Sequence, residues 1–161
     1  MPFYYDITRA TTTNGSGNTE SSHIAGKTVT TQETVGIYGI YATGRSNTAG
    51  GASLRLKDNT GTVFSGGTAT TPTAKNRRGN PAAQSTWVND ATAITPGATL
   101  LTRLAVGFAQ TGGMGGYVPP TQQAAVQMMP GTTNPVDVEV TSIAATASIV
   151  FDLLLDIGEG V

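Results

Sequence analysis

Hydrophobic residues recur at every second position in several parts of the chain, which is the pattern of a half-buried β-strand. The pattern is clearest in the last quarter, where Val136, Val138 and Val140 alternate with acidic residues. A second alternating run covers 145–157 and places apolar side chains on one face and Thr, Ser and Asp on the other. Two long strands are therefore predicted at the C-terminal end.

Shorter runs of the same kind precede them, over 35–41, 85–88 and 100–109. The pattern over 52–66 predicts a hairpin, because alternating residues flank a turn of Asp, Asn, Thr and Gly at 58–61. No segment competes as a long helix. About seven or eight strands at regular spacing are typical of a β-sandwich, so we expect an all-β, single-domain antiparallel β-sandwich. Its topology is a jelly roll or another sandwich arrangement.

Residues 10–34 contain almost no large apolar side chains. Such a segment buries too little surface to offset the entropy lost when it becomes ordered. We therefore expect an extended N-terminal arm over 1–34, followed by the sandwich domain over 35–161. An edge strand followed by a loop is the alternative for the arm.

The composition narrows the possible functions. Charged residues make up 12% of the chain and the net charge is -1, which argues against nucleic-acid binding and a polybasic membrane surface. The absence of cysteine excludes disulfides and thiolate metal sites. No run approaches the roughly 20 apolar residues of a spanning helix. The first residues do not resemble a signal peptide, so we expect synthesis in the cytoplasm.

Candidate catalytic groups are few. The one histidine, His23, falls in the predicted arm, and a Ser-His-Asp triad needs a firmly held imidazole. The sequence Gly26-Lys27-Thr28 ends like a phosphate-binding loop, but Ser21 stands where that loop needs a glycine. We expect no enzymatic activity.

Metal and cofactor sites are not expected either. The paired acids of the two C-terminal strands are interpreted as ordinary solvated side chains of an outer face, although oxygen ligands for calcium are the alternative. The acids concerned are Asp137, Glu139, Asp152 and Asp156. Trp87 is interpreted as a core residue rather than as a platform for sugar stacking.

Three features suggest contact with a protein partner: the aromatic N-terminal segment, the basic cluster near 75–78, and the long irregular segment 110–135. The basic cluster is interpreted first as a solvated loop, with an acidic patch on a partner as the alternative. The candidate contact residues are Phe3, Tyr4, Tyr5, Lys75, Arg77, Arg78, Met114 and Tyr117.

The chain opens with MPFYYDITRATTT and closes with ATASIVFDLLLDIGEGV. Together with the Thr- and Gly-rich, cysteine-free composition, this resembles small structural proteins of tailed-bacteriophage heads. The resemblance implies a decoration (cement) protein that binds the major capsid protein on the outside of the assembled capsid and stabilises it. It also implies a homotrimer, located in the virion and made in the host cytoplasm, with no nucleic acid or membrane as partner.

Two alternatives stay open. One is a carbohydrate-binding or adhesion module of a phage fibre, which would need aromatic side chains exposed on one surface. The candidates for such a surface are Trp87, Tyr38, Tyr41 and Tyr117. The other is a structural protein of the phage tail or neck.

Overall fold

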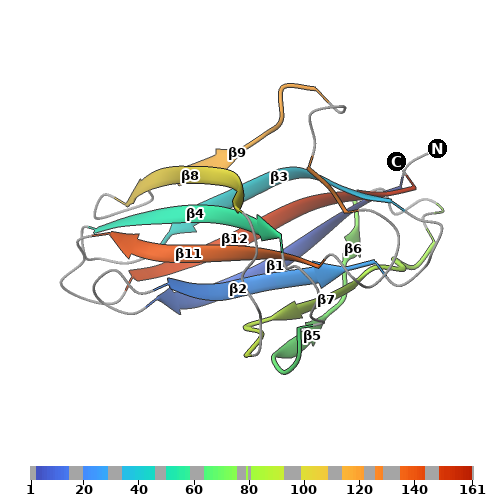
Figure 1. The fold of residues 1–161 in the computed structure, drawn as a ribbon, viewed down its shortest axis with the longest axis horizontal. Coiled ribbons are helices and arrows are strands. Elements are labelled where there is room, and N and C mark those ends of the chain that lie inside the picture. The colour runs from blue at the N-terminus through green and yellow to red at the C-terminus, as the bar shows by residue number, and fades with distance from the viewer. Residues whose placement is uncertain are drawn as a thin grey trace.

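The protein is described by a computed structural model that covers residues 3–14, 20–28, 34–45, 50–58, 64–75, 79, 81–92, 99–108, 114–121, 126–128, 135–143 and 149–160. Figure 1 shows that the regular elements of these residues are β-strands. None of the described segments forms a helix that could cross a membrane. The strands are β1 (Phe3–Asn14), β2 (Glu20–Lys27), β3 (Val35–Gly44), β4 (Gly50–Asp58), β5 (Thr68–Thr70), β6 (Thr73–Ala74), β7 (Thr86–Asn89), β8 (Thr99–Phe108), β9 (Met114–Tyr117), β10 (Val126–Met128), β11 (Val136–Ile143) and β12 (Ile149–Glu159).

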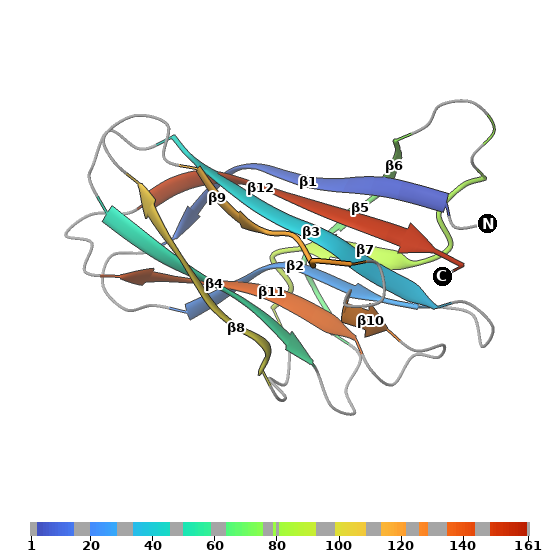
Figure 2. The same cartoon turned by 90° about the horizontal axis from the view of Figure 1, so that it is seen from above.

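The strands form two antiparallel sheets that pack face to face (Figure 2). Sheet A has the order β10-β3-β12-β1-β6, and β9 also pairs with β3. Sheet B has the order β5-β7-β2-β11-β4-β8. The prediction of an all-β antiparallel sandwich is confirmed.

The pairing order identifies the sandwich as a jelly roll. The first strands pair with the last in reverse order: β1 with β12, β2 with β11, β3 with β9 and β10, and β4 with β8. The partners in each pair lie in the same sheet, and successive pairs alternate between sheets A and B. This is one long antiparallel ribbon rolled into two sheets, as in jelly-roll domains.

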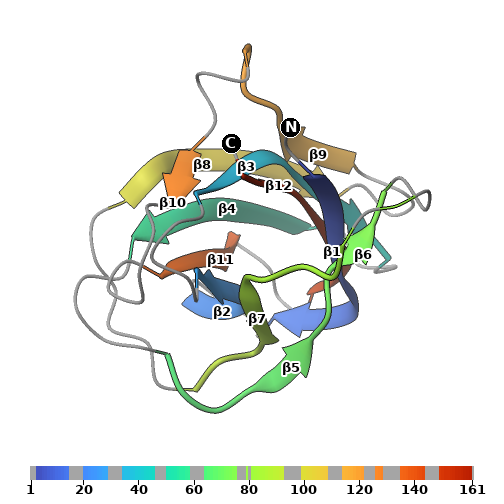
Figure 3. The same cartoon turned by 90° about the vertical axis from the view of Figure 1, so that its right-hand side faces the viewer.

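The segment between β4 and β8 adds three short strands to the roll. β6 pairs with β1 at the edge of sheet A, while β7 and β5 extend sheet B beyond β2. Figure 3 shows these strands on the side of the sandwich formed by β1 and β2. They cover strand edges that would otherwise present unpaired backbone groups. The hairpin predicted over 52–66 is wrong, because β8 and β11 occupy both sides of β4.

A continuous hydrophobic core lies between the sheets. β12 supplies Phe151, Leu153, Leu155 and Ile157, each at most 2% exposed, as its alternation predicts. The valines of β11 at positions 136, 138 and 140 face them from sheet B and are also buried. The predicted apolar face of each C-terminal strand is therefore confirmed for the described residues, and the start of the second run, 145–148, lies outside them.

The N-terminal arm expected over 1–34 differs from what the described residues form. β1 pairs with both β12 and β6, and β2 lies between β11 and β7. Both strands contribute buried side chains to the core, among them Ile7 and Ile24 at 0% and 1% exposure. The polar composition of the segment does not predict these strands, because they are held in the sheets by backbone pairing with strands distant in sequence.

Candidate functional site

The outer face of sheet A carries a group of aromatic and charged side chains. In β12 the core-facing residues alternate with Asp152, Leu154 and Asp156, which point outward. The strand register places Thr8 and Tyr41 on either side of Leu154. Side chains that pair in this way share a face of the sheet. A row of hydroxyl, aliphatic and aromatic groups therefore crosses three strands.

Tyr41 lies flat against the sheet. An ideal Cβ on Gly39 would lie 2.6 Å from a ring carbon of Tyr41, and one on Gly116 would lie 2.9 Å from another. Any side chain at either glycine would displace the ring. The two glycines therefore allow the Tyr41 ring to rest on β3 and β9, half-buried, with its remaining surface toward solvent.

Tyr38 and Tyr4 form a second aromatic group on the same face. The Tyr38 ring lies close to where a Cβ would be on Gly158, at 2.7 Å, and it meets the Tyr4 ring edge-to-face with centroids 5.5 Å apart. Burial raises the pKa of Tyr38, and the neighbouring Tyr4 raises it further. The Tyr38 phenol therefore stays neutral and able to donate a hydrogen bond at physiological pH.

An open hollow of about 400 Å³ lies beside Tyr41. Its volume falls in the range of roughly 300–1,000 Å³ that is typical of small-molecule sites. At one end the Arg45 Nε donates a hydrogen bond of 2.6 Å to Asp152. The hollow is lined by Thr8, Tyr41, Thr43, Asp152, Leu153 and Leu154.

The charged groups next to the hollow pair with one another. The Lys75 Nζ lies 2.6 Å from Asp156 and 3.3 Å from Asp6, which are cross-strand neighbours in β12 and β1. Burial raises the pKa of Asp6, and its hydrogen bond to Asp156 raises it further. Burial alone would lower the pKa of Lys75, but the two carboxylates leave it raised. Lys75 therefore stays charged between two acids.

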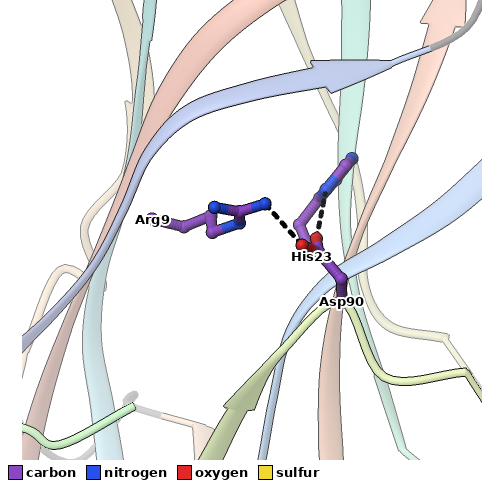
Figure 4. Close-up of polar contacts among 3 residues, drawn as sticks. All are labelled: Arg9, His23 and Asp90. Atoms are coloured by element: carbon purple, nitrogen blue, oxygen red, sulfur yellow. Dashed lines mark hydrogen bonds and ion pairs between the residues drawn. The ribbon is translucent and has the colours of Figure 1, made fainter. Parts of the chain in front are cut away.

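A second polar cluster joins the two sheets at the β1–β2 side (Figure 4). His23 of β2 is the extra residue of a β-bulge opposite β11, and its side chain is 4% exposed. Its ring meets Phe151 edge-to-face at 5.2 Å. Its Nδ1 lies 3.5 Å from Asp90, which also pairs with Arg9 of β1.

A backbone hydrogen bond also holds this cluster in place. The Asp90 N–H donates a hydrogen bond of 3.2 Å to the His23 carbonyl, directly after β7 ends. Asp90 has φ of 52°, a left-handed conformation that Asp tolerates better than most residues. Burial lowers the pKa of His23, although Asp90 opposes the shift. The ring is therefore neutral at pH 7, held in a strand rather than in the arm that the sequence predicts.

Acidification should destabilise the protein through His23. Because its folded-state pKa is lowered, the unfolded chain takes up the proton first as pH falls below about 6.5. We expect the free energy of unfolding to drop by up to about 1 kcal/mol between pH 7.5 and 5.5. Urea unfolding of the wild type and of His23→Gln across this range measures the effect.

The variant should be less stable at pH 7.5 but should show a flatter pH dependence. A wild type that gains stability toward pH 5.5 would contradict the interpretation, because it would mean that Asp90 holds the imidazole protonated.

The predicted contact residues fall into several environments. Tyr4 and Lys75 lie together on the outer face of sheet A, and Phe3 is 37% exposed nearby. Tyr5 is instead a core residue at 1% exposure, and its hydroxyl donates a hydrogen bond of 3.0 Å to the Pro81 carbonyl. Strand alternation accounts for this difference, because Tyr5 shares the core-facing side of β1 with Ile7 whereas Tyr4 faces outward.

The remaining contact candidates lie elsewhere. Met114 and Tyr117 are the end residues of β9, and Tyr117 is half-buried opposite Ile40. Arg77 and Arg78 lie outside the described residues. Trp87 is 1% exposed, so its assignment to the core is confirmed. That these residues contact a partner stays a prediction.

The prediction that the paired acids of the last two strands are solvated side chains is wrong for the two acids of β11. Asp137 is 0% exposed, and Glu139 is 6% exposed with its carboxylate 2.6 Å from the Lys57 Nζ. Lys57 reaches Glu139 from the neighbouring strand β4, which provides the opposite charge that a buried carboxylate needs. Within the described ranges, no three His, Cys, Asp or Glu residues are grouped so that they could hold a metal ion.

Comparisons with known proteins add little. No protein-family model matches the chain, and no curated protein matches its sequence. Among solved structures, a chain of the infectious bursal disease virus Gx strain overlaps at a TM-score of 0.24 and 12% identity. The VP2 subviral particle of the same virus overlaps at 0.26 and 14% identity. Each overlap covers 98% of this chain and 41% of the viral chain, so this chain spans about two fifths of their length. Overlaps this weak carry no conclusion about function.

Proposed function

We propose that the chain is a structural protein of a virion. The observation that carries the proposal is the jelly-roll pairing of β1 to β4 with β8 to β12, an architecture used widely by viral capsid domains. One fold serves many functions, so the jelly roll alone does not establish a virion role. The composition supports the same role independently of the fold. The low charge and the polar, uncharged surface suit short-range packing against a partner, and they match the resemblance to phage-head proteins.

The more specific proposal is a decoration protein that binds the major capsid protein on the outside of the assembled phage head, as a homotrimer. A trimer on a symmetric lattice gains avidity, so each contact can be modest. Contacts with few charges are also insensitive to salt. The protein would be made in the host cytoplasm and incorporated into the virion without catalysing a reaction.

The exposed hydrophobic residues indicate where attachment would occur. Among the described residues, the large hydrophobic side chains with the greatest exposure are Phe3 and Val118, at 37% and 59%. They fall in the aromatic N-terminal segment and in the segment 110–135. Figure 1 shows the part that follows β9 rising away from both sheets. An exposed hydrophobic side chain on a projecting segment is well placed to contact a neighbouring subunit.

Light scattering and sedimentation with phage heads test this proposal. We expect a trimer near three times 16.4 kDa, and co-sedimentation with heads that lack the protein. Val118→Asp should weaken attachment at least tenfold, whereas Thr68→Asp on exposed β5 should leave it unchanged. A monomer at every concentration that does not bind heads would contradict the decoration role. Detection of the protein at the tail or neck of intact virions would instead support a role as a tail or neck protein.

A further inference from the structure

We propose that the outer face of sheet A, centred on the hollow beside Tyr41, binds a neutral oligosaccharide. This activity goes beyond the structural role proposed above, and it does not depend on attachment to a capsid.

Tyr41 supplies the aromatic wall. Its ring is pressed against β3 and β9 because Gly39 and Gly116 leave room for it, so little side-chain freedom remains to be lost on binding. A pyranose ring has an apolar face of C–H groups that packs well against a flat aromatic ring. A pre-positioned tyrosine with one face open to a hollow therefore suits a sugar better than it suits a flexible peptide.

The rest of the hollow supplies hydrogen-bonding groups around an aliphatic floor. Leu154 lies between Thr8 and Tyr41 in the register, and Thr43 lies opposite Asp152. Threonine hydroxyls donate and accept, and the Asp152 carboxylate accepts, which matches the mixed donors and acceptors of sugar hydroxyls. Arg45 donates to Asp152 and fixes the direction of its carboxylate.

The charged groups of this face are paired with one another, which favours an uncharged ligand. Asp152 is paired with Arg45, and Lys75 is paired with both Asp156 and Asp6. An anionic ligand would compete with these carboxylates for Arg45 and Lys75. A cationic ligand would compete with Arg45 and Lys75 for the carboxylates. A ligand that carries hydroxyls but no charge avoids both conflicts and can still use the exposed oxygen atoms.

The second aromatic group extends the face beyond the hollow. Tyr38 precedes Tyr41 by three residues on β3, and because Tyr38 is the extra residue of a β-bulge opposite β12, both side chains lie on the outer face. Tyr38 and Tyr4 lie across the row of Asp6 and Asp156 from Tyr41. This spacing favours an oligosaccharide that runs along β3 over a single sugar.

Calorimetric titration with neutral hexasaccharides tests the inference, using maltohexaose, cellohexaose and a mannose hexamer after a glycan-array screen. We expect at least one of them to bind the wild type. Tyr41→Ala should weaken its affinity tenfold or more, Tyr41→Phe should retain most of it, and Thr43→Val should weaken it several-fold. Thr68→Ala on β5 is the control off this face. Thermal unfolding should show that each variant is folded.

Four outcomes would overturn the inference. The first is that no neutral hexasaccharide binds the wild type. The second is that folded Tyr41→Ala and folded Thr43→Val bind the hexasaccharide with the same affinity as the wild type. The third is selective binding of sulfated or sialylated glycans that is abolished by Lys75→Ala. Attachment to phage heads distinguishes this inference from the structural role, because the Tyr41→Ala variant should still attach to heads. If Tyr41→Ala abolishes attachment or trimerisation, the face contacts protein and the glycan assignment is wrong.

Discussion

Trp87→Ala should lower the free energy of unfolding by about 3–5 kcal/mol, the usual loss for a large aromatic side chain removed from a core. Trp87 is 1% exposed and pairs in register with Gly26 of β2. Its Nε1 donates a hydrogen bond of 2.7 Å to the Ser85 hydroxyl. The variant therefore loses the main core contact of the inserted strands, and equilibrium urea unfolding measures the loss.

Gly26→Ala provides a second test of the same contact. An added Cβ would lie 2.2 Å from a ring carbon of Trp87, so the indole would have to move. We expect overpacking to cost about 1–3 kcal/mol in the wild type. In a Trp87→Ala background the same change should cost much less, because the clashing ring is gone. A double-mutant cycle measures this coupling.

Val88→Ala is the matched control for Trp87→Ala, since Val88 is the next residue of β7 and is only half-buried. It should have a clearly smaller effect. Equal losses for Trp87→Ala and Val88→Ala, or additive effects of Gly26→Ala and Trp87→Ala, would contradict the close contact between the indole and Gly26.

Glu159→Ala should destabilise the protein by about 2–4 kcal/mol, because it leaves two backbone donors without their acceptor. The Glu159 side chain ends β12 and belongs to a residue only 3% exposed. It accepts hydrogen bonds from the backbone N–H groups of Gln84, at 2.9 Å, and Ser85, at 2.8 Å, and from the Ser85 hydroxyl. The carboxylate thus fastens the segment before β7 to the end of sheet A.

Urea unfolding and hydrogen exchange at the two amides measure this effect. Glu159→Gln keeps one side-chain oxygen acceptor and should show an intermediate loss. Gln84→Ala is the control, because it removes an exposed side chain but keeps the backbone N–H that Glu159 accepts. If exchange at Gln84 and Ser85 is as slow in Glu159→Ala as in the wild type, the carboxylate does not hold this segment.

Both large effects concern the segment between β4 and β8, which is the part of the fold that the sequence predicts least well. The alternation of Leu54 and Leu56 predicts a strand correctly, but it carries no information on which strand lies beside it. The hairpin expected there is replaced by pairing of β4 with β8 and β11. The segment beyond β4 instead reaches the far edges of both sheets, where its Trp87 enters the core and Glu159 of β12 accepts hydrogen bonds from it.

The candidate site is also only partly predictable from the sequence. Tyr38 and Tyr41 are recognisable in the sequence as aromatics of a strand, and they were candidates for a sugar-binding surface together with Trp87 and Tyr117. Trp87 lies in the core instead, while Tyr4 joins the surface from the other end of the chain. Asp152 and Thr8 become neighbours of Tyr41 only through the register of β12 with β3 and β1.

The sequence by itself determined the all-β class, the two C-terminal strands, the core position of Trp87 and the lack of cysteine chemistry. These follow from local alternation and composition, which each segment carries within itself. Only the tertiary structure decided the jelly-roll order, the strands within 1–34, the burial of His23 and the Lys57–Glu139 pair. Each of these depends on pairing between residues distant in the chain, and a strand carries little record of its partner because the backbone groups that pair are the same in every residue.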